Sequence, residues 1–263
     1  MVEFWALVTG ASGGLGEAIA RQLGARGMNL VLTARSVERL EAIAASVQAD
    51  SGVEVRFHPA DLSQPGAADA LDEWLVENGI ELDVLVNNAG FGMHGAFVEQ
   101  DLDRLRAMIQ LDVMALTELT HLHARRMLAR GGGRILLVGS MAAYQPVALL
   151  SAYAAAKAYV LAFGEALHVE LAPTVTVTVL SPGLMDTGFN AASGYSTPNS
   201  LKRMEMVPAD VARIGLDALF AGKSGVIAGR LNKVMALASR VVSRHFSARS
   251  QYDIAMRQGG RDG

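Results

Sequence analysis

Short apolar runs alternate along the chain with longer segments in which apolar residues recur every three or four positions. Six of these runs have the length and composition of strands: residues 4–8, 29–33, 53–57, 84–86, 134–138 and 175–180. They are apolar nearly throughout, which indicates burial on both faces, as in a parallel sheet with helices on each side. The pattern therefore predicts an α/β fold with a doubly wound parallel sheet of the Rossmann type.

The second half of the chain continues the same pattern with a helix over 208–220 and a short strand over 225–228. A length of 263 residues suits one large domain, and no repeat or low-complexity linker divides it, so we expect a single domain over residues 1–263. Residues 184–206 are glycine-containing, polar and without a period. They predict a loop or lid over a substrate site, and the alternative is a disordered insertion.

The composition narrows the classes of protein. With 51% hydrophobic and 19% charged residues and a net charge of -3, the chain is neither disordered nor suited to bind nucleic acid. The absence of cysteine excludes disulfides and a thiol nucleophile, and the scattered histidines predict no metal site. A strand-like run from residue 4 leaves no room for a secretory signal, and no apolar run is long enough to span a membrane. We therefore expect a cytoplasmic protein.

A glycine-rich turn joins the first strand to an amphipathic helix over 17–26, with the sequence Thr9-Gly10-Ala11-Ser12-Gly13-Gly14-Leu15-Gly16. Glycines permit positive φ and close backbone approach, and the free N–H groups at a helix start favour a pyrophosphate. The alternative is a tight turn that only lets the helix pack closely. The position at a strand-to-helix junction favours binding of a dinucleotide.

Motifs in a fixed order resemble those of the short-chain dehydrogenase/reductase family. The spacing of Gly10, Gly14 and Gly16 is similar to its TGxxxGxG turn, and Asn87-Asn88-Ala89-Gly90 resembles the NNAG motif that supports the sheet and borders the adenosine ribose. Further matches are a serine, a YxxxK motif and a nicotinamide-side motif: Ser140, Tyr153-Ala154-Ala155-Ala156-Lys157, and Pro182-Gly183 with Thr187. The resemblance covers residues 9–187. It implies a small-molecule carbonyl or alcohol substrate and a homo-oligomer, either a dimer or a tetramer.

The candidate catalytic group is Ser140, Tyr153 and Lys157. Tyr153 and Lys157 are four residues apart on a helix, so they project from one face, where the ammonium favours the phenolate of the tyrosine. Tyr153 would then exchange a proton with the substrate oxygen while Ser140 polarises it, and the resemblance implies that Lys157 also holds the nicotinamide ribose. Without the other motifs, the pair would be read as ordinary partly exposed helix residues.

The second predicted strand ends without the acidic residue with which NAD-preferring relatives grip the ribose hydroxyl. Arg35 stands there instead and predicts NADP(H), with Arg39 as a second partner for the 2′-phosphate. The alternative is an exposed arginine on a solvated helix start. Asp61-Leu62 resembles the family's adenine-contacting pair, although an aspartate at that place also caps a turn.

Asp112 occupies the place where the resemblance implies the asparagine that completes a catalytic tetrad. An ionised Asp112 near Lys157 would offset part of the field that favours the Tyr153 phenolate. In the alternative, Asp112 is protonated or takes part in backbone hydrogen bonds, and the field is unchanged. Met93, His94, Tyr144, Gln145 and residues 184–189 flank the expected substrate side and are read as loop packing.

The C-terminal region predicts one basic amphipathic helix over about 230–246. Its apolar face consists of Leu231, Val234, Met235, Ala238, Val241 and Val242, and its basic face of Arg230, Lys233, Arg240 and Arg244. We expect this helix to pack on its own domain or on a second subunit, and contact with a membrane surface is the alternative.

These features together predict an NADP(H)-dependent oxidoreductase that interconverts a ketone or aldehyde and an alcohol by hydride transfer. The competing functions are a catalytically silent dinucleotide sensor and a membrane-peripheral interaction protein.

Overall fold

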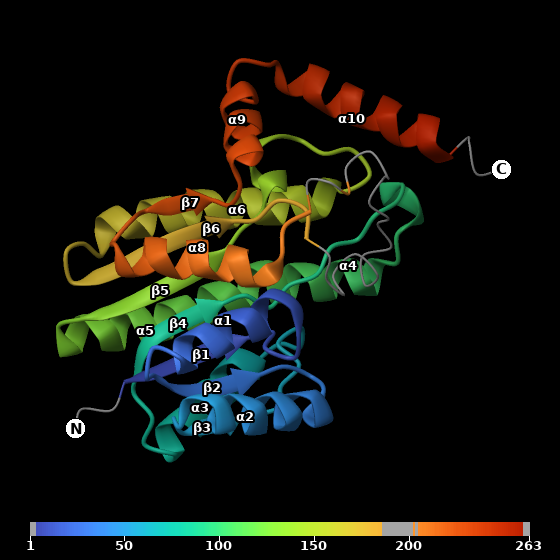
Figure 1. Ribbon diagram of the computed structural model, residues 1–263. Helices are drawn as coiled ribbons and strands as arrows, with labels where there is room; N and C mark the ends of the chain where they lie inside the picture. Colours follow the sequence, from blue (N-terminus) through green and yellow to red (C-terminus); the bar gives the residue numbers. More distant parts are fainter. Residues whose placement is uncertain (1–3, 186–201, 203–204, 260–263) are drawn as a thin grey trace.

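The computed structural model describes residues 4–185, 202 and 205–259, with side chains described as far as residue 253. Within this part of the chain, a single sheet has the strand order β3-β2-β1-β4-β5-β6-β7 (Figure 1). All neighbouring strands are parallel. The strands are β1 (Trp5–Thr9), β2 (Asn29–Thr33), β3 (Val55–Phe57), β4 (Leu82–Asn87), β5 (Gly133–Val138), β6 (Val175–Ser181) and β7 (Gly225–Ile227). The predicted doubly wound parallel sheet is confirmed.

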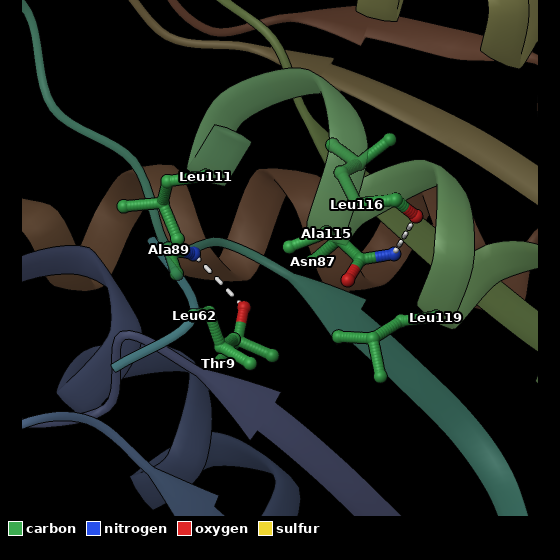
Figure 2. Close-up of a pocket in the computed structure, with 8 residues that line it drawn as sticks. All are labelled: Thr9, Leu62, Asn87, Ala89, Leu111, Ala115, Leu116 and Leu119. Carbon is green, nitrogen blue, oxygen red and sulfur yellow. Dashed lines mark hydrogen bonds between the residues drawn. The ribbon is translucent and has the colours of Figure 1, made fainter. Parts of the chain in front are cut away.

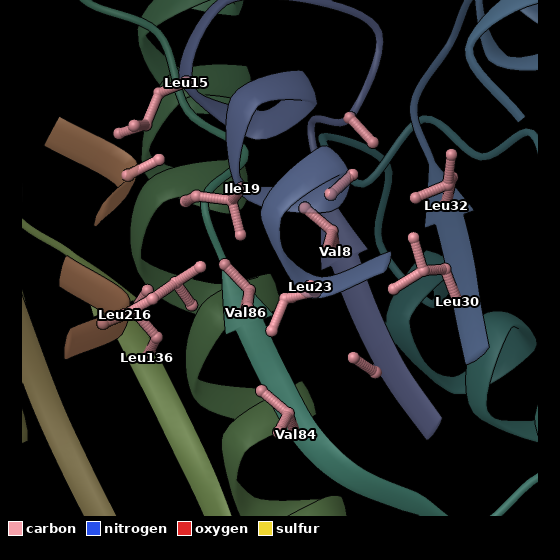
Figure 3. Close-up of a cluster of buried hydrophobic side chains, with 14 of the residues drawn as sticks. Val8, Leu15, Ile19, Leu23, Leu30, Leu32, Val84, Val86, Leu136 and Leu216 are labelled. Carbon is pink, nitrogen blue, oxygen red and sulfur yellow. The ribbon is translucent and has the colours of Figure 1, made fainter. Parts of the chain in front are cut away.

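Helices cover both faces of the sheet. One layer contains α1 (Gly14–Gly24), α2 (Val37–Ser51) and α8 (Pro208–Phe220), and the opposite layer contains α3 (Ala67–Glu77), α5 (Leu116–Arg130) and α6 (Ser151–Glu170). Side chains alternate between these layers along each strand: Val8 packs with the first layer and Leu7 with the second. Figure 3 shows the first of these two cores. Burial on both faces explains why the strands are apolar throughout.

The segment between β4 and β5 contains an irregular helix. It begins with the short 3₁₀-helix η1 (Phe97–Glu99) and α4 (Leu102–Ile109), widens into one π-helical stretch, η2 (Gln110–Ala115), and continues as α5. A π-helical turn changes the direction of the side chains relative to a regular α-helix. In this turn Asp112 becomes fully buried.

The C-terminal region differs from the single helix expected over 230–246. The structure has two helices, α9 (Arg230–Ala238) and α10 (Arg244–Gly259), with a turn over residues 239–243 between them. The predicted loop over 184–206 lies largely outside the described residues. At its two ends Met185 and Met206 form a parallel bridge, and the Met206 N–H donates to the Leu184 carbonyl at 2.9 Å. Among the described helices, none has the length and apolar character needed to cross a bilayer.

Candidate functional site

The candidate site lies at the carboxyl edge of the sheet. The sheet order reverses between β1 and β4, because β1 is followed along the chain by β2 on one side and lies beside β4 on the other. In parallel α/β sheets, ligands bind at such a point, outside the carboxyl ends of the strands. The segments that follow β1, β4, β5 and β6 carry most of the predicted site residues, so the fold brings them to one edge.

The glycine turn after β1 requires its glycines at two positions. Gly10 has φ of +66°, a conformation that favours glycine over other residues. A Cβ on Gly16 would lie 2.2 Å from the carbonyl oxygen of Gly10, so a side chain there would collide with the backbone of the turn. The close approach of α1 to β1 therefore depends on this motif.

The NNAG segment after β4 holds the glycine turn in place. The Asn88 amide donates from Nδ2 to the Thr9 carbonyl at 2.9 Å, and the backbone N–H groups of Asn88 and Ala89 donate to Thr9 Oγ1 at 3.0 and 2.9 Å. Asn87 points the other way, donating from Nδ2 to Thr120 Oγ1 on α5 at 2.9 Å. Sequence reasoning did not single out Thr9, although a hydroxyl at the end of an apolar strand was a signal.

Figure 2 shows a pocket beside these bonds, at the junction of η2 and α5. Its lining is mostly apolar, and it is too small to hold a water molecule. We therefore assign it to packing between the NNAG segment and the helix, because a binding site needs at least the volume of its ligand. The residues that line it are Thr9, Leu62, Asn87, Ala89, Leu111, Ala115, Leu116 and Leu119.

The start of α1 fits the pyrophosphate of a dinucleotide. Gly13 is the N-cap residue of this helix and supplies no side-chain hydrogen bond to its free N–H groups. Among the described residues, a Cβ on Gly13 would meet only one atom within 4 Å, Nη1 of Arg39 at 4.0 Å, so this part of the chain leaves the turn open and places a guanidinium beside it. In the same turn Ser12 is partly exposed, while Leu15 is buried in the core. An anion is favoured at such a helix start.

Arg35 and Asp61 lie at the ends of β2 and β3. Burial would raise the pKa of Asp61, but hydrogen bonds from Ser63 lower it, and the exposed Arg35 is close enough to act in the same direction. Asp61 accepts hydrogen bonds from the Ser63 backbone and hydroxyl at 3.1 and 2.7 Å, so it caps a turn, which was the second role considered for it. Its neighbour Leu62 is buried.

The candidate catalytic side chains converge after β5 and on α6. Ser140 lies two residues after the end of β5, and its hydroxyl accepts from the Ala142 N–H at 3.1 Å and interacts with the Tyr153 hydroxyl. Tyr153 and Lys157 lie one turn apart on α6, and Lys157 Nζ lies 5.7 Å from the centre of the Tyr153 ring. The same Nζ donates to the Val138 carbonyl at 3.2 Å, which fixes Lys157 against the end of β5.

Asp112 reaches the same cluster from the π-helical turn. Its Oδ1 lies 3.5 Å from Lys157 Nζ, and its Oδ2 has no hydrogen-bond partner among the described residues. Gly90 of the NNAG segment packs against both residues: a Cβ there would lie 2.1 Å from Asp112 Oδ1 and 3.2 Å from Lys157 Nζ. The absence of a side chain at Gly90 therefore leaves room for the Asp112–Lys157 pair.

Burial and charge act together on the pKa values of this cluster. Burial raises the pKa of Asp112 to about 6, although Lys157 and a backbone hydrogen bond from Phe91 act to lower it. Burial also raises the pKa of Tyr153, with Lys157 lowering it and Asp112 raising it further. Burial lowers the pKa of Lys157, but Asp112 and Tyr153 raise it, and the net change is upward. We expected Lys157 to lower the pKa of Tyr153. In the protein without cofactor, the effect of burial is larger, and the pKa of Tyr153 is raised.

The segment after β6 is the last of the segments that lie at the carboxyl edge of the sheet. The Met141 N–H donates to the Pro182 carbonyl at 2.9 Å, which ties this segment to the one after β5. Gly183 packs on Asn232 of α9, and a Cβ on Gly183 would lie 2.2 Å from Asn232 Nδ2. Asn232 was missed by sequence reasoning, and a polar residue inside the amphipathic pattern was the available signal. Thr187, predicted to contact the cofactor, lies outside the described residues.

The described loop residues flanking the substrate side have identifiable partners. Met93 packs in a small apolar cluster with Leu105, Met108 and Tyr153, so it lies beside the candidate catalytic tyrosine. The Tyr144 hydroxyl lies 3.3 Å from Ser181 Oγ, at the end of β6.

Comparison with known proteins agrees with the family that the motifs indicate. The family model described as short chain dehydrogenase matches residues 4–196. The chain is a member of the short-chain dehydrogenase family. A 17-beta-hydroxysteroid dehydrogenase type 3 from Homo sapiens is 34% identical over 70% of this chain, which spans 59% of the length of the human enzyme. A 7beta-hydroxysteroid dehydrogenase from Clostridium sardiniense is 30% identical, with 87% of each protein covered.

Among solved structures, a short-chain dehydrogenase from Sphingobium yanoikuyae in complex with NADPH superposes with a TM-score of 0.80. It is 29% identical, with 92% of this chain and 97% of the other covered. This member of the short-chain dehydrogenase family thus has the family's Rossmann-type sheet.

Proposed function

We propose that this protein is an NADP(H)-dependent oxidoreductase that interconverts a ketone or aldehyde and an alcohol. The observation that carries the proposal is the convergence of Ser140, Tyr153 and Lys157 at the carboxyl edge of the sheet, next to the open start of α1. One side of this edge offers groups for a dinucleotide, and the other offers a proton donor and a hydroxyl for a substrate oxygen.

The bound nicotinamide would supply the hydride and accept it in the reverse direction. Tyr153 would donate its phenolic proton to the developing alkoxide during reduction and take it back during oxidation. The Ser140 hydroxyl interacts with Tyr153 and would donate a hydrogen bond to the same oxygen, holding the carbonyl in place. Burial of Tyr153 keeps its proton on at neutral pH, which suits a donor.

Lys157 would have two roles at this site. Its ammonium group lies against the Tyr153 ring and favours the phenolate that forms when the tyrosine gives up its proton. The family resemblance also assigns it to the ribose of the nicotinamide. Asp112 would act through Lys157, because its carboxylate lies 3.5 Å from Nζ and opposes the positive field. We therefore describe Asp112 as a positioning residue.

The glycine turn and the positive groups near it would hold the cofactor. Gly10, Gly14 and Gly16 shape the turn, and the N–H groups at the start of α1 would bind the pyrophosphate. Arg35, with Arg39 beside the turn, would bind the 2′-phosphate of NADP(H), and Asp61 with Leu62 would border the adenine. Asn88, Ala89 and Gly90, together with Pro182 and Gly183, would line the rest of the cofactor site. The NADPH complex of the Sphingobium yanoikuyae relative supports this choice of cofactor.

The experiment that tests the proposal is a screen of NADPH consumption over ketones and aldehydes of graded size and polarity, beginning with steroid ketones because the named relatives act on hydroxysteroids. NADPH binding is measured in parallel by quenching of protein fluorescence. Turnover with at least one carbonyl compound, faster with NADPH than with NADH, is the expected result. Tight NADPH binding with no turnover across the screen would instead favour the silent sensor.

A further inference from the structure

The two C-terminal helices form an arm at one end of the molecule. We define the C-terminal arm as residues 230–253, which comprise α9, the turn after it and the part of α10 with described side chains. Figure 1 shows α9 and α10 beyond the helical layers that flank the sheet. In α9 only Asn232 and Ala236 are buried, one helical turn apart. α9 is thus attached to the body through a narrow strip of small and polar side chains, and Ser247 is the buried residue in the described part of α10.

Most of the large apolar side chains of the arm are exposed. At about 100° per residue, Val234 lies on the opposite side of α9 from Asn232 and Ala236. Its exposed fraction is 63%, and Val241 in the turn is 87% exposed. In the part of the chain that the structure describes, this face does not pack on the chain's own domain as expected. The exposed apolar side chains of the arm are Leu231, Val234, Met235, Leu237, Val241, Val242, Phe246 and Tyr252.

The arm is also positively charged, whereas the rest of the chain is negative. Residues 230–253 contain five Lys and Arg and one Asp, a net charge of +4. Taking these from 23 basic and 26 acidic residues leaves 18 basic and 25 acidic residues, a net charge of -7 for the remainder. Arg249 pairs with Asp253 at 3.3 Å. Within the described part of the chain, no ion pair involves Arg230, Lys233, Arg240 or Arg244.

A hollow of about 230 Å³ separates part of α9 from the body. It is lined by Tyr144, Glu165, Ile227, Lys233, Ala236, Leu237 and Arg240. Glu165 on α6 is the acidic side chain that faces this hollow, and it carries one negative charge against the two cations that share the lining. The body therefore leaves most of the arm's positive charge uncompensated.

We propose that the C-terminal arm docks this protein on the surface of a membrane that contains anionic lipids. Exposed apolar side chains flanked by cations match a surface whose headgroups are negative and whose acyl region begins just below them. A second copy is a poorer match, because a symmetric contact between two arms would bring two sets of cations together. The negative body would be held away from the lipid, with its charges screened beyond about 8 Å at physiological salt.

The test is cosedimentation of the full-length protein with vesicles of phosphatidylcholine alone or mixed with phosphatidylglycerol, at low and high NaCl. Wild type is expected to bind the mixed vesicles at least about tenfold more strongly than the neutral ones, with binding weakened by salt. Arg230→Glu/Arg244→Glu, at exposed positions outside the hollow, should lower binding at least about tenfold, because two attractions become repulsions. The matched control is Arg125→Glu/Lys223→Glu, which reverses two exposed cations outside the arm and should retain more of the binding.

The apolar contribution is tested with Val234→Ser/Val241→Ser, compared with Val76→Ser/Val169→Ser, which removes exposed valines from α3 and α6. The arm variant should lose vesicle binding, and the control should retain it. NADPH binding and the thermal midpoint of each variant show whether it is folded. Equal binding of wild type to neutral and anionic vesicles, or to neither, overturns the proposal. So does a lipid-free dimer in sedimentation velocity that Val234→Ser/Val241→Ser dissociates, because the arm would then serve a second copy.

Discussion

Asp112 and Lys157 form a fully buried pair in contact with the candidate catalytic tyrosine. Both side chains are 5% exposed or less, so little water screens their effect on Tyr153. The pKa of Asp112 is about 6, which means that the carboxylate is ionised through the alkaline range in which a tyrosine titrates. The two charges therefore oppose each other at Tyr153 under the conditions of alcohol oxidation.

The substitution Asp112→Asn should retain activity and shift the pH profile of alcohol oxidation. Removing the negative charge lowers the pKa of Tyr153, so the phenolate required for oxidation forms at lower pH. The limb of the kcat/KM profile on which activity rises as Tyr153 loses its proton is expected to move toward lower pH. The matched control is Asp103→Asn, on the exposed face of α4, which should leave the limb in place. A limb that stays or moves to higher pH contradicts an electrostatic role for Asp112.

The substitution Arg35→Asp should change the choice of cofactor. It removes a cation that would pair with the 2′-phosphate and adds an acceptor for a ribose hydroxyl. Because a charge-assisted hydrogen bond contributes about 1.5–3 kcal/mol, the ratio of kcat/KM for NADPH to that for NADH should fall at least about tenfold. Steady-state kinetics with both cofactors measures it, with Lys223→Asp as the control. An unchanged ratio would show that Arg35 does not bind the 2′-phosphate.

The helix from residue 102 to 130 shows what periodicity could not predict. Its apolar pattern indicates a helix, but nothing in the sequence marks the change from α to π geometry at Gln110. That change decides which way Asp112 points, so the sequence left open whether its side chain meets Lys157. The strands were easier to predict, because burial on both faces leaves continuous apolar runs, and β2 has the predicted bounds.

At the contact between α3 and α5, a buried histidine should make the protein sensitive to acid. Burial, with help from Arg126 and Arg130 and against the effect of Asp72, lowers the pKa of His123 from 6.5 to about 4. The folded state therefore resists protonation of His123, and the stability present above pH 6.5 is lost as pH falls toward 4. A shift of this size corresponds to on the order of 3 kcal/mol.

Chemical denaturation of His123→Gln at several pH values tests this. Glutamine does not titrate, so the variant should lose less unfolding free energy than wild type between pH 6.5 and pH 4, by up to that amount. His121→Gln, on the exposed side of the same helix, should follow wild type. If wild type and His123→Gln lose the same free energy over this range, His123 is not the acid-sensitive group.

At the scale of the whole molecule, parallel topology explains why motifs spread over residues 9–183 meet at one edge. The motifs identify residues that follow individual strands, and the parallel topology brings the carboxyl ends of these strands to one edge. The contact between Asn232 of α9 and Gly183 could not be predicted from the sequence. It depends on the direction that the chain takes after β7, which no motif or period indicates. The cytoplasmic location and the homo-oligomer stay predictions.

The turnover of Tyr153→Phe tests the central claim most directly. The substitution keeps the buried ring and removes the proton donor, so the variant should fold and bind NADPH as wild type does. Its kcat for carbonyl reduction should fall by about 100-fold to 10,000-fold, the usual contribution of a general acid. The control is Tyr159→Phe on the same helix, whose hydroxyl lies 2.8 Å from Thr117 Oγ1, and it should retain activity. Wild-type turnover by Tyr153→Phe would contradict the account.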